Sequence, residues 1–175
     1  MALHLIIDGY NLIRRSDRLR RAEDKSLELG RRALIDELAA YSGMKGYKIT
    51  VVFDGGQNNE PFEARSAEKG IRIRFSRHGQ TADSVIVNMA RRDAQKAMVV
   101  TADRELAAKV AAKEAVPVDP GEFEEKMEMA KLMEVKGTGE EDGDRQGWVP
   151  TTRKKGPARR LPKSRRRQLR KVKKL

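Results

Sequence analysis

Residues 3–8 read Leu-His-Leu-Ile-Ile-Asp, an almost continuously apolar run that ends in an aspartate. Such a run is typical of a β-strand that is buried on both faces of its sheet. Three further apolar runs are each followed by an aspartate: residues 49–53 by Asp54, residues 71–75 by Asp83, and residues 98–100 by Asp103. The chain therefore contains four predicted strands that each lead to a carboxylate.

Helical patterns fall between the predicted strands. We expect strands over residues 3–8, 48–53, 71–75, 97–101 and 115–118, and helices over residues 26–45, 82–96, 103–113 and 119–135. The stretch at residues 55–69, which is rich in Gly and Asn at its start, is expected to be a loop. Strands that alternate with helices form right-handed βαβ units, so the expected fold class is α/β with a mainly parallel sheet.

Positive charge is concentrated at the C-terminal end of the chain. Of the 38 Lys and Arg residues, 13 lie within residues 153–175, while all 26 Asp and Glu residues precede this segment. Blocks of like charge repel and rarely fold alone, so we expect a disordered basic tail. The predicted organisation is a folded domain at residues 1–135, an acidic and polar linker at 136–152, and the tail at 153–175.

Composition excludes several kinds of site. The chain has no cysteine, which rules out disulfides and thiolate zinc sites. Its two histidines, His4 and His78, are too few for a histidine-based metal centre or a Ser-His-Asp triad. No phosphate-binding loop of the Gly-x-Gly-x-x-Gly or Gly-Lys-Ser/Thr type occurs. Since no apolar run reaches the length of a membrane span and no secretory signal is evident, we expect a cytoplasmic protein.

The four aspartates are expected to meet at one edge of the sheet. Ligands of open α/β sheets bind at the carboxyl ends of the strands, which is where Asp8, Asp54, Asp83 and Asp103 would gather. Two carboxylates about 5 Å apart repel by roughly 3 kcal/mol at an effective dielectric constant of 20, and a bound cation relieves this repulsion. Because oxygen ligands suit hard divalent ions, we predict a Mg²⁺ or Mn²⁺ site that activates water for phosphoryl transfer.

A purely structural explanation of the same residues stays open. Asp83 and Asp103 lie near predicted helix starts, where a carboxylate caps free N–H groups for about 0.3–1 kcal/mol. Thr81 and Thr101 are alternative caps, and an Asp-Gly pair, as at residue 8, is also typical of a turn.

Arginines present a second open choice. The run at residues 71–75 alternates apolar residues with arginine, which indicates an exposed face or an edge position in the sheet. Arg72, Arg74 and Arg77 either line a groove for a nucleic-acid backbone or form a solvated face without a function.

The ordered motifs resemble those of a known nuclease family. Asp8-Gly9-Tyr10-Asn11-Leu12-Ile13, Val52-Phe53-Asp54-Gly55, Thr81-Ala82-Asp83 and Val100-Thr101-Ala102-Asp103 look like the motifs of NYN domains in the PIN-like nuclease superfamily. The bacterial YacP-like group is the most similar, over roughly residues 1–135. The resemblance implies a PIN-like three-layer α/β/α fold and Mg²⁺- or Mn²⁺-dependent RNA cleavage. Members of the group are linked to endonucleolytic cutting of RNA, in at least one case on the ribosome.

The resemblance also implies roles for individual residues. Asp8, Asp83 and Asp103 would be the catalytic metal ligands, with Asp54 as a further catalytic carboxylate. Asn11 would orient the first aspartate or contact the scissile phosphate.

Three other residues bear on the resemblance. Thr101, beside the last aspartate, is expected to contact RNA. The chain departs from the group at Val87 and Ala107, where Glu and Gln are usual. This smaller acidic set keeps a non-catalytic RNA- or ribosome-binding protein as the alternative function.

The basic tail is predicted to bind RNA through its phosphates, which gives a salt-sensitive and sequence-independent affinity. The residues expected to do so are Arg159, Arg160, Lys163, Arg165, Arg166, Arg167, Arg170 and Lys171. The predicted function is therefore a metal-dependent endoribonuclease that leaves a 5′-phosphate and a 3′-hydroxyl, with RNA and the ribosome as partners. A structure-selective DNA nuclease is a further alternative, because Val-Phe-Asp-Gly also occurs in flap-type relatives.

Overall fold

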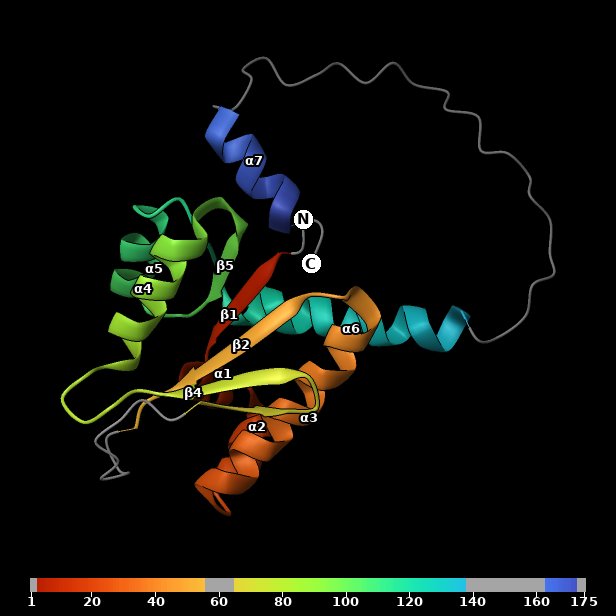
Figure 1. Cartoon of the computed structure of the whole chain (residues 1–175). Helices are drawn as coiled ribbons and strands as arrows, with labels where there is room; N and C mark the ends of the chain where they lie inside the picture. The colour runs from red at the N-terminus through yellow and green to blue at the C-terminus, as the bar shows by residue number, and fades with distance from the viewer. Residues whose placement is uncertain (1–2, 56–64, 138–162, 173–175) are drawn as a thin grey trace, which may run out of the picture.

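The computed structural model describes residues 3–55, 65–137 and 163–172. The strands of this part of the chain form one sheet in the order β3-β4-β2-β1-β5-β6 (Figure 1). Their bounds are β1 His4–Asp8, β2 Lys48–Phe53, β3 Arg65–Glu68, β4 Ile71–Phe75, β5 Ala97–Val100 and β6 Val116–Val118. All neighbours pair in parallel except β3, which is antiparallel to β4.

Helices cover both faces of the sheet. One layer contains α1 Gly9–Arg15, α2 Asp17–Glu23, α3 Leu27–Lys45 and α6 Pro120–Gly137, and the other contains α4 Ala82–Asp93 and α5 Arg104–Ala111 (Figure 1). A short 3₁₀ turn at Ala94–Lys96 joins α4 to β5, and α7 Lys163–Val172 lies beside β6. The predicted three-layer α/β/α arrangement with a mainly parallel sheet is confirmed.

Alternation along the central strands builds two cores, one against each helix layer. In β1, Leu5 and Ile7 pack with α1 and α3, while Ile6 packs with α4 and α5. Because β1, β2 and β5 are buried on both faces, they appear in the sequence as continuous apolar runs.

The topology leaves a crevice at the carboxyl end of β1. The chain runs from β1 outward through β2 and β4, then returns to the opposite side of β1 as β5. Neighbouring strands β1 and β5 are thus followed by helices on opposite faces, which makes their carboxyl ends a topological switch point.

One prediction about the sheet needs correction. Residues 65–68, expected to belong to a loop, form β3. β4 is therefore an inner strand, and of the two expectations for residues 71–75 it is the exposed face that applies. All four residues of β3 are exposed, so no buried apolar pattern marked this strand. Short helices α1 and α2 also formed where no element was predicted.

The basic tail is a further correction. Lys163–Val172 form helix α7, whereas the tail was expected to lack regular structure. Val172 is half-buried against the core cluster on the α6 side of the sheet, so an apolar contact supports this helix where like charges oppose it. Residues 138–162, with most of the predicted linker, lie outside the described residues.

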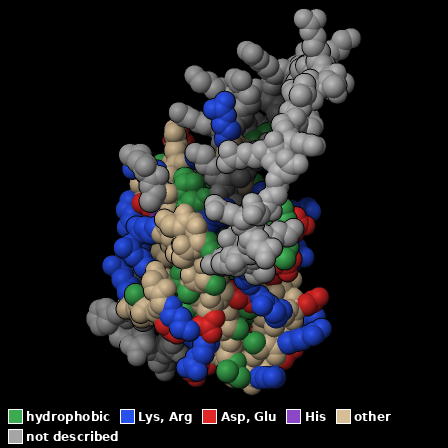
Figure 2. All heavy atoms as spheres, turned by 90° about the vertical axis from the view of Figure 1, so that its right-hand side faces the viewer, with side chains coloured by type: hydrophobic (Ala, Val, Ile, Leu, Met, Phe, Trp, Pro, Cys, Tyr) green, Lys and Arg blue, Asp and Glu red, His purple; other side chains and the backbone are tan. Residues whose placement is uncertain are grey.

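The described surface mixes side chains of different kinds. Figure 2 shows the α6 side of the molecule, where basic, acidic and hydrophobic side chains are interspersed. Met129, Leu132 and Met133 of α6 are exposed. Among the described residues, no helix combines the length and the hydropathy that crossing a bilayer requires.

Candidate active site

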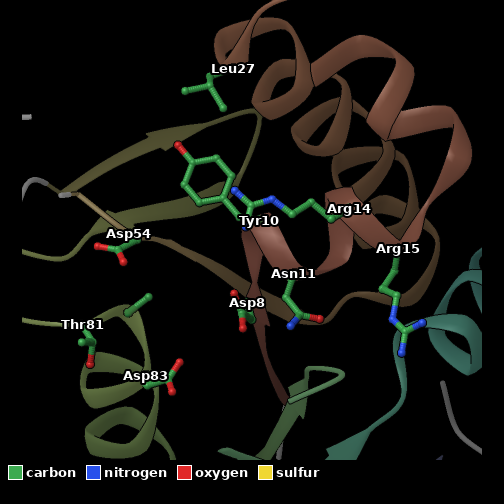
Figure 3. A pocket seen from close by; sticks show the side chains of 10 residues that line it. Asp8, Tyr10, Asn11, Arg14, Arg15, Leu27, Asp54, Thr81 and Asp83 are labelled. Atoms are coloured by element: carbon green, nitrogen blue, oxygen red, sulfur yellow. The ribbon is translucent and has the colours of Figure 1, made fainter. Parts of the chain in front are cut away.

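A pocket of about 610 Å³ opens at the carboxyl ends of β1 and β2 (Figure 3). Three of the four predicted carboxylates line it: Asp8 at the end of β1, Asp54 after β2, and Asp83 in the first turn of α4. Figure 3 shows Asp8 and Asp83 facing the same space between β1 and α4. The remaining lining residues are Tyr10, Asn11, Arg14, Arg15, Leu27, Thr81 and Ala82.

Asp8 is the most perturbed carboxylate of the pocket. It precedes α1 as the N-cap residue, yet its side chain makes no capping hydrogen bond. Burial, and then the negative charge of Asp83, raise the pKa of Asp8 from 3.8 to about 6. The nearby backbone N–H of Asn11 and, after it, the Thr101 hydroxyl, which donates to Oδ2 of Asp8 at 3.4 Å, oppose this shift only in part. A cation in the pocket would remove the cost of ionising this carboxyl group.

Asp83 does not cap its helix either. Thr81 caps α4, because its Oγ1 accepts a hydrogen bond from the backbone N–H of Ser84 at 3.3 Å. Burial, and then the charge of Asp103, raise the pKa of Asp83, while Lys109 lowers it. Of the two explanations for Asp83, capping is therefore the one that the structure does not support.

Asp103 serves as a helix cap, as the structural explanation anticipated. Its Oδ1 accepts hydrogen bonds from the backbone N–H groups of Glu105 at 2.7 Å and Leu106 at 3.1 Å, which caps α5. Asp103 is not among the residues that line the pocket, although its charge raises the pKa of both Asp8 and Asp83. It contributes to the electrostatics of the site from the rim.

Asp54 is held by a residue that sequence reasoning missed. The hydroxyl of Ser76, which directly follows β4, donates to Oδ1 of Asp54 at 3.1 Å. Oγ of Ser76 in turn accepts a hydrogen bond from the backbone N–H of Gly55 at 3.0 Å. A Cβ on Gly55 would lie 2.0 Å from the carbonyl oxygen of Ser76, so close packing rather than a turn explains this Asp-Gly pair.

Hydrogen bonds of Asn11 and Thr101 connect the loop after β5 with the end of β1 and the start of α1. Oδ1 of Asn11 accepts from the backbone N–H of Ala102 at 2.9 Å. Thr101 is only 4% exposed, and its Oγ1 donates to Asp8 and accepts from the N–H of Asp103 at 3.1 Å. Asn11 also lines the pocket, whereas the burial of Thr101 gives it a positioning role.

Two arginines and a tyrosine of α1 complete the pocket, and none of them was predicted. Arg14 lies over the ring of Tyr10 at 5.6 Å from its centroid, and Tyr10 contacts Phe53 with centroids 5.0 Å apart. The signal was available in the sequence, because Arg14 and Arg15 follow Tyr10 and Asn11 by four residues each, which is the spacing of neighbours on a helix.

The residues of the pocket fit a hard divalent ion with an incomplete protein shell. Within residues 3–55, 65–137 and 163–172, no three His, Asp or Glu side chains are close enough together to hold a metal by themselves. In the same part of the chain, Asp8 and Asp83 form no salt bridge. Carboxylate oxygens suit Mg²⁺ or Mn²⁺, which usually keeps several waters and takes further oxygens from a phosphate.

The predicted tail residues are only partly described. Arg159 and Arg160 lie outside the described residues. The others, Lys163, Arg165, Arg166, Arg167, Arg170 and Lys171, lie on α7. Arg170 is exposed and Lys171 is half-buried, and neither lines the carboxylate pocket.

Comparison with known proteins places this arrangement in a family. The sequence matches the YacP-like NYN domain over residues 5–174, which includes the four aspartates and the basic tail. This chain belongs to the YacP-like NYN family. The fold expected from the resemblance is confirmed, and it is of a nuclease type.

Relatives of this YacP-like protein are known from Bacillus subtilis. The uncharacterized protein YacP of strain 168 is 30% identical over 86 residues, which cover 49% of this chain and 50% of that protein. The chain thus aligns with about half the length of this curated relative. The crystal structure of a mutant of Rae1 (YacP) superposes with a TM-score of 0.65 at 24% identity, covering 78% of this chain and 80% of Rae1. A second crystal structure of Rae1 (YacP) gives a TM-score of 0.62, also at 24% identity.

Proposed function

We propose that this protein is a metal-dependent endoribonuclease that hydrolyses phosphodiester bonds of RNA, including RNA presented on the ribosome. One observation carries the proposal: Asp8 and Asp83 face a single pocket, and the charge of Asp83 helps to raise the pKa of Asp8. Family membership supports the class of reaction. Perturbed carboxylates in a cleft are typical of catalytic sites.

The chain's own residues divide the work in the proposed reaction. Asp8 and Asp83, with Asp54 nearby, would hold Mg²⁺ or Mn²⁺ only together with water and phosphate oxygens, and the ion would supply a Lewis acid and a water of lowered pKa at the scissile phosphate. Arg14 and Arg15 would bind phosphate oxygens, since guanidinium groups match their geometry.

A second candidate is a non-catalytic RNA- or ribosome-binding protein on the same fold. Three observations favour it. Asp103 uses one carboxylate oxygen as a helix cap, and within the described ranges no group of three acidic or histidine side chains can hold a metal alone. In addition, Val87 packs against the α4 core where the family often has a glutamate, so this position adds no ligand.

The two candidates are separated by an assay of cleavage and binding on the same labelled oligonucleotides. Single-stranded RNA and DNA are incubated with wild type, Asp83→Asn and Asp17→Asn, in Mn²⁺, Mg²⁺ or EDTA. Asp17 is an exposed carboxylate of α2 and serves as the matched control. We expect Mn²⁺-dependent cleavage of RNA that falls at least about 100-fold in Asp83→Asn, a loss of about 2.7 kcal/mol of transition-state stabilisation.

Other outcomes have definite meanings. RNA binding by wild type without any cleavage would establish the non-catalytic candidate. Faster cleavage of DNA than of RNA would make the protein a DNA nuclease. Equal activity of Asp83→Asn and Asp17→Asn would remove Asp83 from the site. Binding of Mn²⁺, followed by electron paramagnetic resonance, gives a second readout that does not depend on turnover.

A further inference from the structure

Arginines share a face of the sheet with the carboxylates of the pocket. Along a strand, side chains alternate between the two faces, so Asp54 continues the row of Thr50 and Val52 on the α4 side. The register of β2 and β4 places Arg72 beside Thr50 and Arg74 beside Val52. Both arginines therefore lie on the α4 side as well.

A second pocket, of about 520 Å³, lies along this arginine row. Arg65 of β3, which pairs with Arg74, and Arg92 at the end of α4 also line it. The remaining lining residues are His4, Thr50, Ser66, Ala67, Ile73 and Met89. We refer to Arg65, Arg72, Arg74 and Arg92 as the arginine cluster. Four guanidinium groups around one cavity form a site suited to phosphate oxygens.

The floor of this second pocket is fixed by buried hydrogen bonds. His4 is 3% exposed; its Nε2 bonds Oγ1 of Thr50 at 2.8 Å, and its Nδ1 pairs with the carboxylate of Asp93. The same carboxylate binds Nε of Arg92 at 3.1 Å. This network compensates one positive charge of the arginine cluster and holds Arg92 in place at the wall of the pocket.

The two pockets lie at the two ends of α4. Asp83 in its first turn lines the carboxylate pocket, and Arg92 in its last turn lines the arginine pocket. Nine residues of helix separate them, a rise of about 13.5 Å. On the facing wall, Arg72, Arg74 and Ser76 follow one another in steps of about 6.6 Å, and Ser76 binds Asp54. A polymer bound in one pocket could therefore extend along α4 and β4 into the other.

We propose that a single strand of RNA runs from the carboxylate pocket along α4, and that the arginine cluster binds its phosphates beyond the cleavage site. This inference rests on the proposed function. RNA is favoured over an acidic protein because the arginine row leads to the pocket proposed for RNA cleavage, so that one strand would engage both pockets. The bound phosphates would give an affinity that depends on salt and not on base sequence.

Binding measurements with a matched pair of variants test the arginine cluster. Arg72→Gln/Arg74→Gln removes two charges from the pocket, while Arg32→Gln/Lys113→Gln removes two exposed charges from α3 and from the turn after α5. Fluorescence anisotropy of a labelled oligouridylate is followed in EDTA over a range of salt. We expect the cluster variant to bind about 10-fold more weakly, with a salt slope reduced by about 0.7 for each lost contact, and the control to stay within about two-fold.

A thiol footprint locates the RNA without removing any arginine. The chain has no cysteine, so Ala67→Cys, in the arginine pocket, and Ala112→Cys, exposed after α5, each introduce one reactive group. We expect bound oligouridylate to slow maleimide modification at position 67 at least about five-fold and to leave position 112 unchanged. Equal rates at position 67 with and without saturating RNA would overturn the proposed path.

The footprint tests the path of the RNA and the cleavage assay tests the nuclease activity, so the two proposals can be rejected separately. Protection at position 67 by an RNA that the wild type never cuts would reject the nuclease and keep the path. Cleavage without protection would reject the path and keep the nuclease. A wild type that binds no oligouridylate at all would reject both.

Discussion

Ionisation of the Asp8 side chain destabilises the folded state. Its pKa is about 6 in the folded protein and 3.8 in the reference state. Between these values the folded state holds more protons than the unfolded state, so stability falls as the pH rises from 3.8 to 6. Above that range the ionised carboxylate costs up to about 3 kcal/mol.

We therefore expect Asp8→Asn to unfold at a higher temperature than wild type at neutral pH in EDTA. The gain should shrink as the pH falls and vanish near about pH 4, because both proteins are then neutral at this position. Circular dichroism melts over this pH range provide the measurement. Mn²⁺ should raise the Tm of wild type and leave that of Asp8→Asn unchanged.

Asp17→Asn is the control for this experiment, since the Asp17 side chain is 83% exposed. A lower Tm for Asp8→Asn at neutral pH would mean that the carboxylate stabilises the fold, which contradicts the argument from burial and from Asp83.

The sequence predicted that these carboxylates gather at one end of the sheet but not how they divide their roles. Thr81 and Asp103 both occupy the N-cap position, while Asp83 lies two residues after the N-cap, in the first turn of its helix. A shift of the helix start by two residues would reverse these roles, and helix ends are the part of a pattern that sequence defines least. Ser76 was missed because its partner, Asp54, comes from a different strand.

At the scale of elements, the contact between α1 and β2 depends on a missing side chain. A Cβ on Gly9 would lie 2.3 Å from Cε1 of Phe53. We expect Gly9→Ala to destabilise the protein by about 2 kcal/mol or more, as overpacking of a filled core does. Urea unfolding measures the change in free energy.

Gly43 supplies the matched control, since it lies exposed within α3 and a Cβ there meets nothing within 4 Å. Gly43→Ala should stabilise the protein by about 0.5–1 kcal/mol, because glycine is unfavourable inside a helix. A neutral Gly9→Ala would show that α1 can move away from β2 without cost.

Buried elements were predictable and exposed ones were not. The runs of β1, β2 and β5 are apolar because both faces are covered, and α4 shows one apolar stripe. β3 has no buried residue, and its existence depends on pairing with β4. Similarly, α7 carries a dense positive charge. This helix contacts β6, a strand that is distant from it in the sequence.

At the scale of the whole molecule, the basic tail and the folded part should contribute separable properties. Deleting residues 153–175 removes 13 positive charges and should weaken RNA binding with a shallower dependence on salt. Cleavage of short RNA at high protein concentration should persist, because the deletion leaves the carboxylate pocket intact. Anisotropy titrations and a gel assay measure the two effects.

The deletion also removes the contact of Val172 with the core. A full-length variant with Arg165, Arg166 and Arg167 changed to Gln keeps this contact and lowers only the charge. An identical salt slope in the truncated and full-length proteins would show that the tail does not bind RNA.

The outer strands have a consequence for how copies of this protein behave at high concentration. β3 is a strand of four exposed residues, and β6 is only three residues long, with Pro117 at its centre, which offers no N–H to an incoming strand. Proteins that coat a polyanion reach high local concentrations, where open sheet edges promote aggregation. Sheet edges that are short, charged or interrupted by proline favour copies of the protein that stay separate and dissociate one at a time.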